Sequence, residues 1–348
     1  MKMADSSTNN TLFQENPVVS SSGQTNRMIE VLIFPTKEDS PRLNKTTAMR
    51  FVSDGTRNTL GITVHIEKSI LGIPPSTSVM LYNISRDTFS AIRKPDMKMV
   101  INVYPGLFET SSSDQYSEEQ VIENDQYQGW IQVYSGAVTG VKSEKEGADI
   151  ITTVFSLTKA EQYLYSVSTA SYSAGTKMSD IAKDLGNNMK AQAVLVDTRI
   201  GVIEIGWGGF TFQGCTADIL NKLGFQYGFT WSFYDNVLHV RHDDSVTGRI
   251  TVISPESGLM SATPILAGPF QIMSGVNVKS FYWPDTVEGN LVEVKSAINT
   301  YLNGQYRIHL MHIDLSTVSN QWDMNLDCFV NPVSGQIWDL KTYGIRGV

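Results

Sequence analysis

The sequence predicts a mainly β fold with an α+β insert, in which two β-barrel or β-sandwich regions flank a small α+β module. Runs of alternating apolar and polar residues, typical of half-buried strands, recur before residue 160 and again after residue 250. Segments rich in Ser, Thr, Asn and Gly separate these runs. Apolar residues at helical spacing mark the segment between them. We therefore expect an N-terminal arm at 1–27, a first β region at 28–160, the α+β module at 161–249 and a second β region at 250–348.

Composition and charge narrow the class of protein. The 348 residues suffice for two or three domains, and 41% hydrophobic with 18% charged residues indicates a soluble globular protein. The net charge of −8 argues against a protein that grips nucleic acid through its phosphates, because that mode requires clustered Lys and Arg. The sequence has no apolar run of about 20 residues, as a membrane helix requires, and no signal-peptide core. We expect a soluble protein that is not exported by a conventional route.

The first β region is organised around residues 78–104, which are predicted to form a strand, a short helix, a turn and a returning strand. Ser85 is the expected N-cap of the helix, because a serine oxygen can accept a hydrogen bond from a free amide at a helix start. Pro95 ends this helix, since it has no amide hydrogen and restricts the residue before it. Further strands are expected at 28–34, 50–53, 60–67, 129–141 and 149–157, with 142–147 as the turn of the last hairpin.

Two polar segments are expected to lie outside the folded core. Residues 1–27 contain few large apolar side chains and predict an arm that is disordered in the isolated chain and ordered only by neighbouring subunits. Residues 109–128 contain Asp and Glu but no Lys or Arg, which favours a solvated loop, with a cation or partner site as the alternative. The spacing of a calcium-binding loop is absent from this segment.

The α+β module is predicted to contain two helices. The first carries apolar residues at i, i+3, i+4 and i+7 from Met178, is capped by Thr176 and stops at Gly186. The second is capped by Thr216 and stops at Gly224. Short strands are expected at 193–195 and 202–207, a flexible link at 206–209, and a hairpin at 229–234 and 237–241 with Asp235-Asn236 as its turn.

The second β region is predicted from four strand-like runs. A tight turn at Asn303-Gly304 separates the second run from the third. The four expected strands are 275–283, 291–297, 307–315 and 322–329.

Two His-x-x-His pairs raise the question of a metal site. They are His239 and His242, followed by Asp243 and Asp244, and His309 and His312, followed by Asp314. A zinc-protease motif needs two histidines four apart on a helix, with Glu beside the first. Here the spacing is three and the context predicts strands, which would send the two rings to opposite faces. We expect ordinary surface or core histidines and no metal ligands.

No catalytic constellation is visible in the sequence. A nucleophile elbow and a phosphate-binding loop are both absent, and 206–209 lacks the spacing of a dinucleotide-binding turn. Acidic residues are plentiful, but none sits in a recognisable glycosidase frame. Cys215 and Cys328 are far apart and form no CxxC pattern, so we expect buried free thiols. The prediction is a protein without enzymatic activity, cofactor or catalytic residues.

The ordered succession of segments resembles a known family, the central baseplate hub proteins of contractile-tailed bacteriophages and related injection machines. The resemblance covers residues 28–330, and only the acidic stretch at 109–128 departs from it, where the family has a short turn. The resembling segments are Val79-Met-Leu-Tyr-Asn-Ile-Ser85 with Thr88 and Ile92, then 100–104, 133–138, 147–153, 167–176, 275–280, 291–296, 303–307 and 322–328.

The resemblance implies a structural virion protein. It implies a homotrimer in which two tail-tube-like β domains per chain give pseudo-sixfold symmetry, so that the trimer docks on the hexameric tail tube and receives the trimeric central spike on its other face. Other baseplate proteins would surround it, and the tape measure protein and the DNA would pass through its lumen. The protein would be made in the cytoplasm of the host bacterium and located in the tail baseplate. Partner-binding residues are not predicted.

Two alternatives remain open from sequence. The six Trp and fourteen Tyr residues could serve a tail protein that binds host-surface carbohydrate, although aromatic residues more often pack in cores and interfaces. A hub with an associated peptidoglycan hydrolase activity is the second alternative. Repetition of the two β regions favours the structural hub, because three chains can match a hexamer only if each supplies two similar units.

Overall fold

A computed structural model describes most of the chain. The described residues are 13–14, 27–36, 48–54, 59–104, 130–234, 237–242, 245, 247–267, 272–319 and 321–330. The expected arm at 1–27 lies outside them except for 13–14 and Arg27, and the acidic segment at 109–128 lies outside them entirely.

The first β region forms the strands that its alternating pattern predicts. Its elements are β2 (Met28–Pro35), β3 (Met49–Ser53), β4 (Ile62–Ser69), β5 (Ser76–Tyr82), α1 (Arg86–Ile92), β6 (Met97–Tyr104), β7 (Ile131–Glu146) and β8 (Asp149–Leu157). Ser85 is the N-cap of α1, as predicted, and its hydroxyl accepts a hydrogen bond of 3.1 Å from the amide of Thr88. The expected turn at 142–147 is too long, because β7 continues to Glu146, which pairs with Asp149.

The α+β module carries more elements than its sequence predicts. They are α3 (Ala160–Tyr165), β9 (Val167–Tyr172), α4 (Met178–Asn188), β10 (Ala193–Val196), α5 (Thr198–Gly201), β11 (Phe210–Cys215), α6 (Thr216–Tyr227), β12 (Phe229–Tyr234) and β13 (Val237–His242). The predicted hairpin is confirmed as β12 and β13, although its turn at 235–236 lies outside the described residues. The strand predicted at 202–207 is wrong, because this segment contributes one isolated bridge, between Glu204 and Lys177.

The predicted helix ends in this module are also wrong. Gly186 and Gly224 lie inside α4 and α6, where a larger residue would collide with Val194 and with the backbone of Phe229. These glycines therefore permit close packing instead of ending a helix, and α6 stops at Gly228, whose φ of 70° is left-handed.

The two predicted threonine N-caps are also wrong, because both hydroxyls bond to groups outside the helix starts. The N-caps of the two helices are Lys177 and Cys215, and neither side chain caps its helix. The hydroxyl of Thr176 instead donates to the carbonyl of Ser173 at 2.8 Å. The hydroxyl of Thr216 lies 2.7 Å from that of Ser168. Both threonines satisfy neighbouring loops and strands and leave the helix starts uncapped.

The second β region completes the main sheet. Its elements are β14 (Thr247–Ile253), β15 (Leu259–Ala267), β16 (Ile272–Phe281), β17 (Asn290–Val294), the 3-10 helix η1 (Thr300–Leu302), β18 (Gly304–Ser316) and β19 (Trp322–Val330). The four predicted strands are confirmed as β16 to β19. Sequence analysis missed β14 and β15, and a short strand, β1 (Phe13–Gln14), pairs in parallel with β14.

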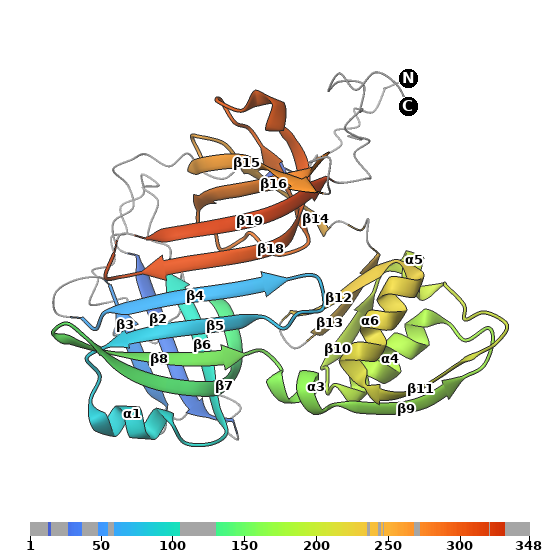
Figure 1. Cartoon of the computed structure of the whole chain (residues 1–348), viewed down its shortest axis with the longest axis horizontal. Helices are drawn as coiled ribbons and strands as arrows, with labels where there is room; N and C mark the ends of the chain where they lie inside the picture. Colours follow the sequence, from blue (N-terminus) through green and yellow to red (C-terminus); the bar gives the residue numbers. More distant parts are fainter. Residues whose placement is uncertain are drawn as a thin grey trace, which may run out of the picture.

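One large sheet runs through both β regions. Its order from one end is β15-β16-β19-β18-β4-β5-β8-β7-β6-β2-β3, and β17, β14 and β1 continue from β18 on a second path. Strands β2 and β6 lie behind β5 and β8 (Figure 1), so the sheet folds over itself as a sandwich instead of closing as a barrel. The fold class is therefore mainly β with an α+β insert, as predicted.

The described residues form two large hydrophobic cores and a small third cluster of Leu32, Phe34 and Val100. The larger is shared by both β regions and includes Val64 and Val79 from the first and Ile313 and Met324 from the second. The smaller belongs to the α+β module, where α4 and α6 pack on the sheet β10-β13-β12. The domain boundaries at 160 and 249 remain a prediction, although the α+β module has a core of its own.

Gly275 in β16 gives a test of this packing. A Cβ atom at this position would collide with the backbone carbonyl of Cys328 in β19. We expect Gly275→Ala to lower the free energy of unfolding by about 1–3 kcal/mol, as overpacking does in a rigid core, measured by urea denaturation. Gly140→Ala in β7 is the matched control, since its nearest contact would be an ordinary 3.8 Å to Phe155. An equal loss of unfolding free energy in the two variants would contradict the close packing of β16 against β19.

Candidate functional site

The strands β15-β16-β19-β18-β4-β5-β8-β7 present one continuous face (Figure 1). Along β4, Ile62, Val64 and Ile66 are buried in the core, so the residues between them point to the opposite face. The same alternation in β18 and β19 leaves polar side chains on this face. We call it the polar sheet face; its members on β4, β18, β19 and β16 are Thr63, His65, Glu67, His312, Asp314, Asp323, Asn325, Asp327, Asn277 and Lys279.

The polar sheet face is acidic. Cross-strand register places Asp314 opposite Asp323, and Glu67 and Asp327 lie on the same face. The cation among the named members is Lys279, whose Nζ lies 3.1 Å from Asp323. On β7 the same face carries Lys142 and Glu144, which pair with each other at 3.2 Å. The four carboxylates against one ammonium on the other strands give this face a negative potential, which repels phosphate groups.

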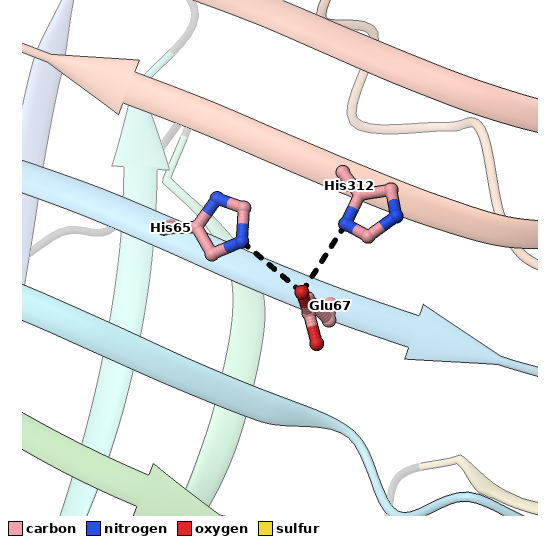
Figure 2. Close-up of side chains that lie close together, drawn as sticks. All are labelled: His65, Glu67 and His312. Carbon is pink, nitrogen blue, oxygen red and sulfur yellow. Dashed lines mark hydrogen bonds and ion pairs between the residues drawn. The ribbon is translucent and has the colours of Figure 1, made fainter.

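Four of these side chains meet where β4 pairs with β18. His65 is the cross-strand partner of Asp314, and Glu67 is the partner of His312. His65 Nδ1 lies 2.5 Å from Asp314 Oδ1, and His65 Nε2 lies 3.4 Å from Glu67 Oε1. His312 Nδ1 approaches the same Glu67 oxygen at 3.4 Å, so the carboxylate bridges the two rings (Figure 2). We call these four residues the seam cluster.

The seam cluster is half-exposed and electrostatically linked. The two imidazole rings stack with centroids 5.9 Å apart and planes inclined by 21°. Partial burial lowers the pKa of His65, but hydrogen bonds and charge from Asp314 and Glu67 outweigh this effect and leave the pKa raised. The cluster thus joins the two β regions through side chains as well as through backbone pairing.

The structure separates the members of both His-x-x-His pairs that raised the question of a metal site. His309 lies at a β-bulge and its ring packs 4.7 Å from Phe329, whereas His312 belongs to the seam cluster. His239 Nδ1 lies 3.3 Å from a nitrogen of Arg241 in the α+β module. Asp243 and Asp244 lie outside the described residues. Neither pair acts as a unit.

Sequence analysis missed His65 and Glu67 as candidates. They stand two apart on a strand, which predicts that they share a face, but their partners are remote: His65 and Asp314 are 249 residues apart. Only the pairing of β4 with β18 brings these residues together. Both cysteines are free thiols, but the prediction that they are buried holds only for Cys328, because Cys215 is half-buried. Burial raises the pKa of Cys328 well above its usual value.

A cavity of about 1130 Å³ lies apart from the polar sheet face, among β6, β7 and α3. Its wall combines apolar residues such as Phe34 and Val100 with the amines of Lys98 and Lys159. Burial, together with the positive charges of Lys98 and Lys190, lowers the pKa of Lys159. The wall of the cavity therefore mixes apolar and charged groups.

The half-buried histidine His309 generates a pH prediction. Burial and the charge of Arg307 lower the pKa of His309 to about 4. An unfolded histidine titrates near 6.5, so the unfolded chain takes up this proton first and stability is lost as the pH falls from about 6.5 to 4. Between pH 7.5 and pH 4 the free energy of unfolding should fall in both proteins. We expect the fall to be about 1–3 kcal/mol smaller in His309→Gln than in the wild type, measured by urea denaturation. An equal pH dependence of the two proteins would contradict this assignment.

Comparison with known proteins gives the family. No helix among the described residues is long and apolar enough to cross a membrane. The search of curated proteins found no match. The family model of the baseplate hub gp41 matches residues 47–328, which is most of the chain.

Solved structures share the fold. The tail protein of Neisseria meningitidis MC58 has a TM-score of 0.57 at 9% identity, covering 88% of this chain and 97% of its own. The 43 kDa tail protein of prophage MuSo2 from Shewanella oneidensis has 0.57 at 9%, covering 87% and 97%. The Escherichia coli c3393 protein, a component of the type VI secretion system, has 0.51 at 8%, covering 79% and 75%.

These findings confirm the resemblance seen in the sequence. The match over 47–328 includes both β regions and the α+β module, and the structures with similar folds are tail and secretion-system proteins. The chain belongs to the baseplate hub gp41 family, a family of structural proteins of the phage tail baseplate.

Proposed function

We propose that three copies of this chain form the ring that joins the hexameric tail tube to the trimeric central spike. The observation that carries this proposal is the pairing of β4 with β18. It joins two four-stranded antiparallel sheets, β4-β5-β8-β7 and β18-β19-β16-β15, edge to edge within one chain. Each chain thus supplies two similar units, and three chains supply six. A threefold ring of this kind can match both a sixfold tube and a threefold spike.

The free edges of this double sheet supply a route to ring closure. Within the described residues, β15 pairs only with β16, and the part of β7 beyond residue 138 pairs only with β8. These edges lie at opposite ends of the eight-strand sheet (Figure 1). Unpaired strand edges bind other strands through their backbone groups. Pairing of β15 in one copy with β7 in the next is a head-to-tail contact, and such a contact forms a ring when the rotation between copies closes after three.

The polar sheet face suits the wall of the channel. Its carboxylates, Glu67, Asp314, Asp323 and Asp327, outnumber Lys279. DNA that leaves through such a channel meets repulsion instead of counterion-releasing contacts that would retain it. The tape measure protein and the DNA would pass along this face, and other baseplate proteins would contact the outer surface. We propose a structural role without catalytic activity, for a protein made in the bacterial cytoplasm.

The proposal predicts the native mass of the assembly. The chain mass is 38.6 kDa, and we expect light scattering after size-exclusion chromatography to give three times this mass for the protein alone. If the ring forms only with the tube and spike proteins, the complex should contain three copies of this chain. Negative-stain averages should show a threefold ring with an open centre. A stable monomer in the presence of both partners would contradict the hub.

Edge variants test the route to closure. Ser261→Lys with Thr263→Lys places two charges on the edge strand β15, and charged edge residues oppose strand pairing. We expect this double variant to remain monomeric. Thr211→Lys with Gln213→Lys is the matched control, because it adds the same two charges at exposed positions of β11 in the α+β module, away from the ring edge. Circular dichroism should show that both variants keep the wild-type fold. Ring formation by the double variant would reject β15 as the closing edge.

A further inference from the structure

The seam cluster has the donor atoms of a transition-metal site. Glu67 Oε1 lies 3.4 Å from His65 Nε2 and 3.4 Å from His312 Nδ1 (Figure 2). A tetrahedral ion with metal–ligand bonds of about 2.1 Å holds its ligand atoms about 3.4 Å apart. One ligand atom from each of the three residues can be chosen so that all lie within 4.8 Å of one another. The distances from Glu67 Oε1 to the two ring nitrogens therefore already fit a tetrahedral ion. Rotation of one imidazole would bring the two ring nitrogens to the same separation.

Asp314 orients the first histidine for this task. Its carboxylate lies 2.5 Å from Nδ1 of His65, so that this nitrogen carries the proton and donates it to the carboxylate. When an ion displaces the proton from Nε2, this nitrogen, which faces Glu67, has a lone pair free to bind the ion. A carboxylate on the distal nitrogen of a ligating histidine is the usual support of a zinc site. Ser76 on β5 supports the other ligand, because its hydroxyl lies 3.5 Å from Glu67 Oε2.

Rigid elements hold these groups. All four side chains project from paired strands, with His65 opposite Asp314 and Glu67 opposite His312. The side chains of His65 and Glu67 are 40% and 48% exposed, so a water molecule can reach the fourth position of an ion. Ligands on paired strands are placed more accurately than ligands on loops.

The donor set selects the class of ion. Two imidazole nitrogens and one carboxylate suit zinc and its neighbours in the transition series. Calcium and magnesium take oxygen ligands and would leave both imidazoles unused. We propose that His65, Glu67 and His312 bind one Zn²⁺ per chain, with Asp314 as a positioning residue. The bound ion joins β4 to β18 across the line where the two β regions meet. This proposal does not depend on the trimer.

The test uses the untagged full-length protein after treatment with a chelator. We expect isothermal titration with ZnCl₂ to show one site per chain, and Zn²⁺ to raise the thermal midpoint of the wild type. Magnesium chloride should do neither. Co²⁺ as a probe should give the visible absorption of a tetrahedral site. Wild-type protein that binds no stoichiometric Zn²⁺ would overturn the proposal.

Variants distinguish the seam cluster from adventitious binding. His312→Gln and Glu67→Gln should each weaken Zn²⁺ binding by at least about tenfold, and Asp314→Asn by about 10–100-fold, as loss of a supporting carboxylate does. His242→Gln is the control, because it removes a histidine outside the cluster. Melting curves recorded without metal show which variants fold. If a variant of a ligand residue does not fold, Asp314→Asn still tests the site, because Asp314 is a positioning residue and not a ligand. Unchanged binding by the folded cluster variants would also overturn the proposal.

Discussion

The antiparallel pairing of β4 with β18 is the interaction on which the rest of this structure depends. It runs in register from Ser69 opposite Leu310 to Thr63 opposite Ser316, and it connects segments from the two ends of the chain. On one side the pairing brings Ile66 and Ile313 into the shared core. On the other side it builds the polar sheet face. Without this ladder, each β region would expose an apolar layer and an open strand edge.

The same pairing links fold to function. In the proposed ring, the two four-stranded sheets that this pairing joins take the places of two neighbouring subunits. The buried side of the sheet fixes its register, because a slip by one residue would send Ile66 and Ile313 to the polar face. The polar side is then free to carry charge suited to a channel. Across the seam it also carries the three side chains proposed to hold an ion, His65, Glu67 and His312.

Much of the fold could be predicted from local pattern, and the failures have physical causes. Alternation predicted β16 to β19, and the Ser85 cap was correct because its hydrogen bond is local. The helix ends predicted at Gly186 and Gly224 were wrong, because these glycines make room for Val194 and Phe229 in contacts that only the tertiary fold creates. The edge strand β15 was missed, and its Pro264 is a residue that strands tolerate chiefly at edges. The seam cluster could not be predicted, since nothing local relates His65 to His312.

The central claim, that this chain is the symmetry adaptor of a tail baseplate, is tested most directly by a cryo-electron microscopy map of the tail end of the intact virion. The account predicts three copies around the tail axis, six four-stranded units in the ring, and the face that bears Glu67 and Asp314 turned toward the channel. A copy number other than three, or a ring in which this face points outward, would contradict it.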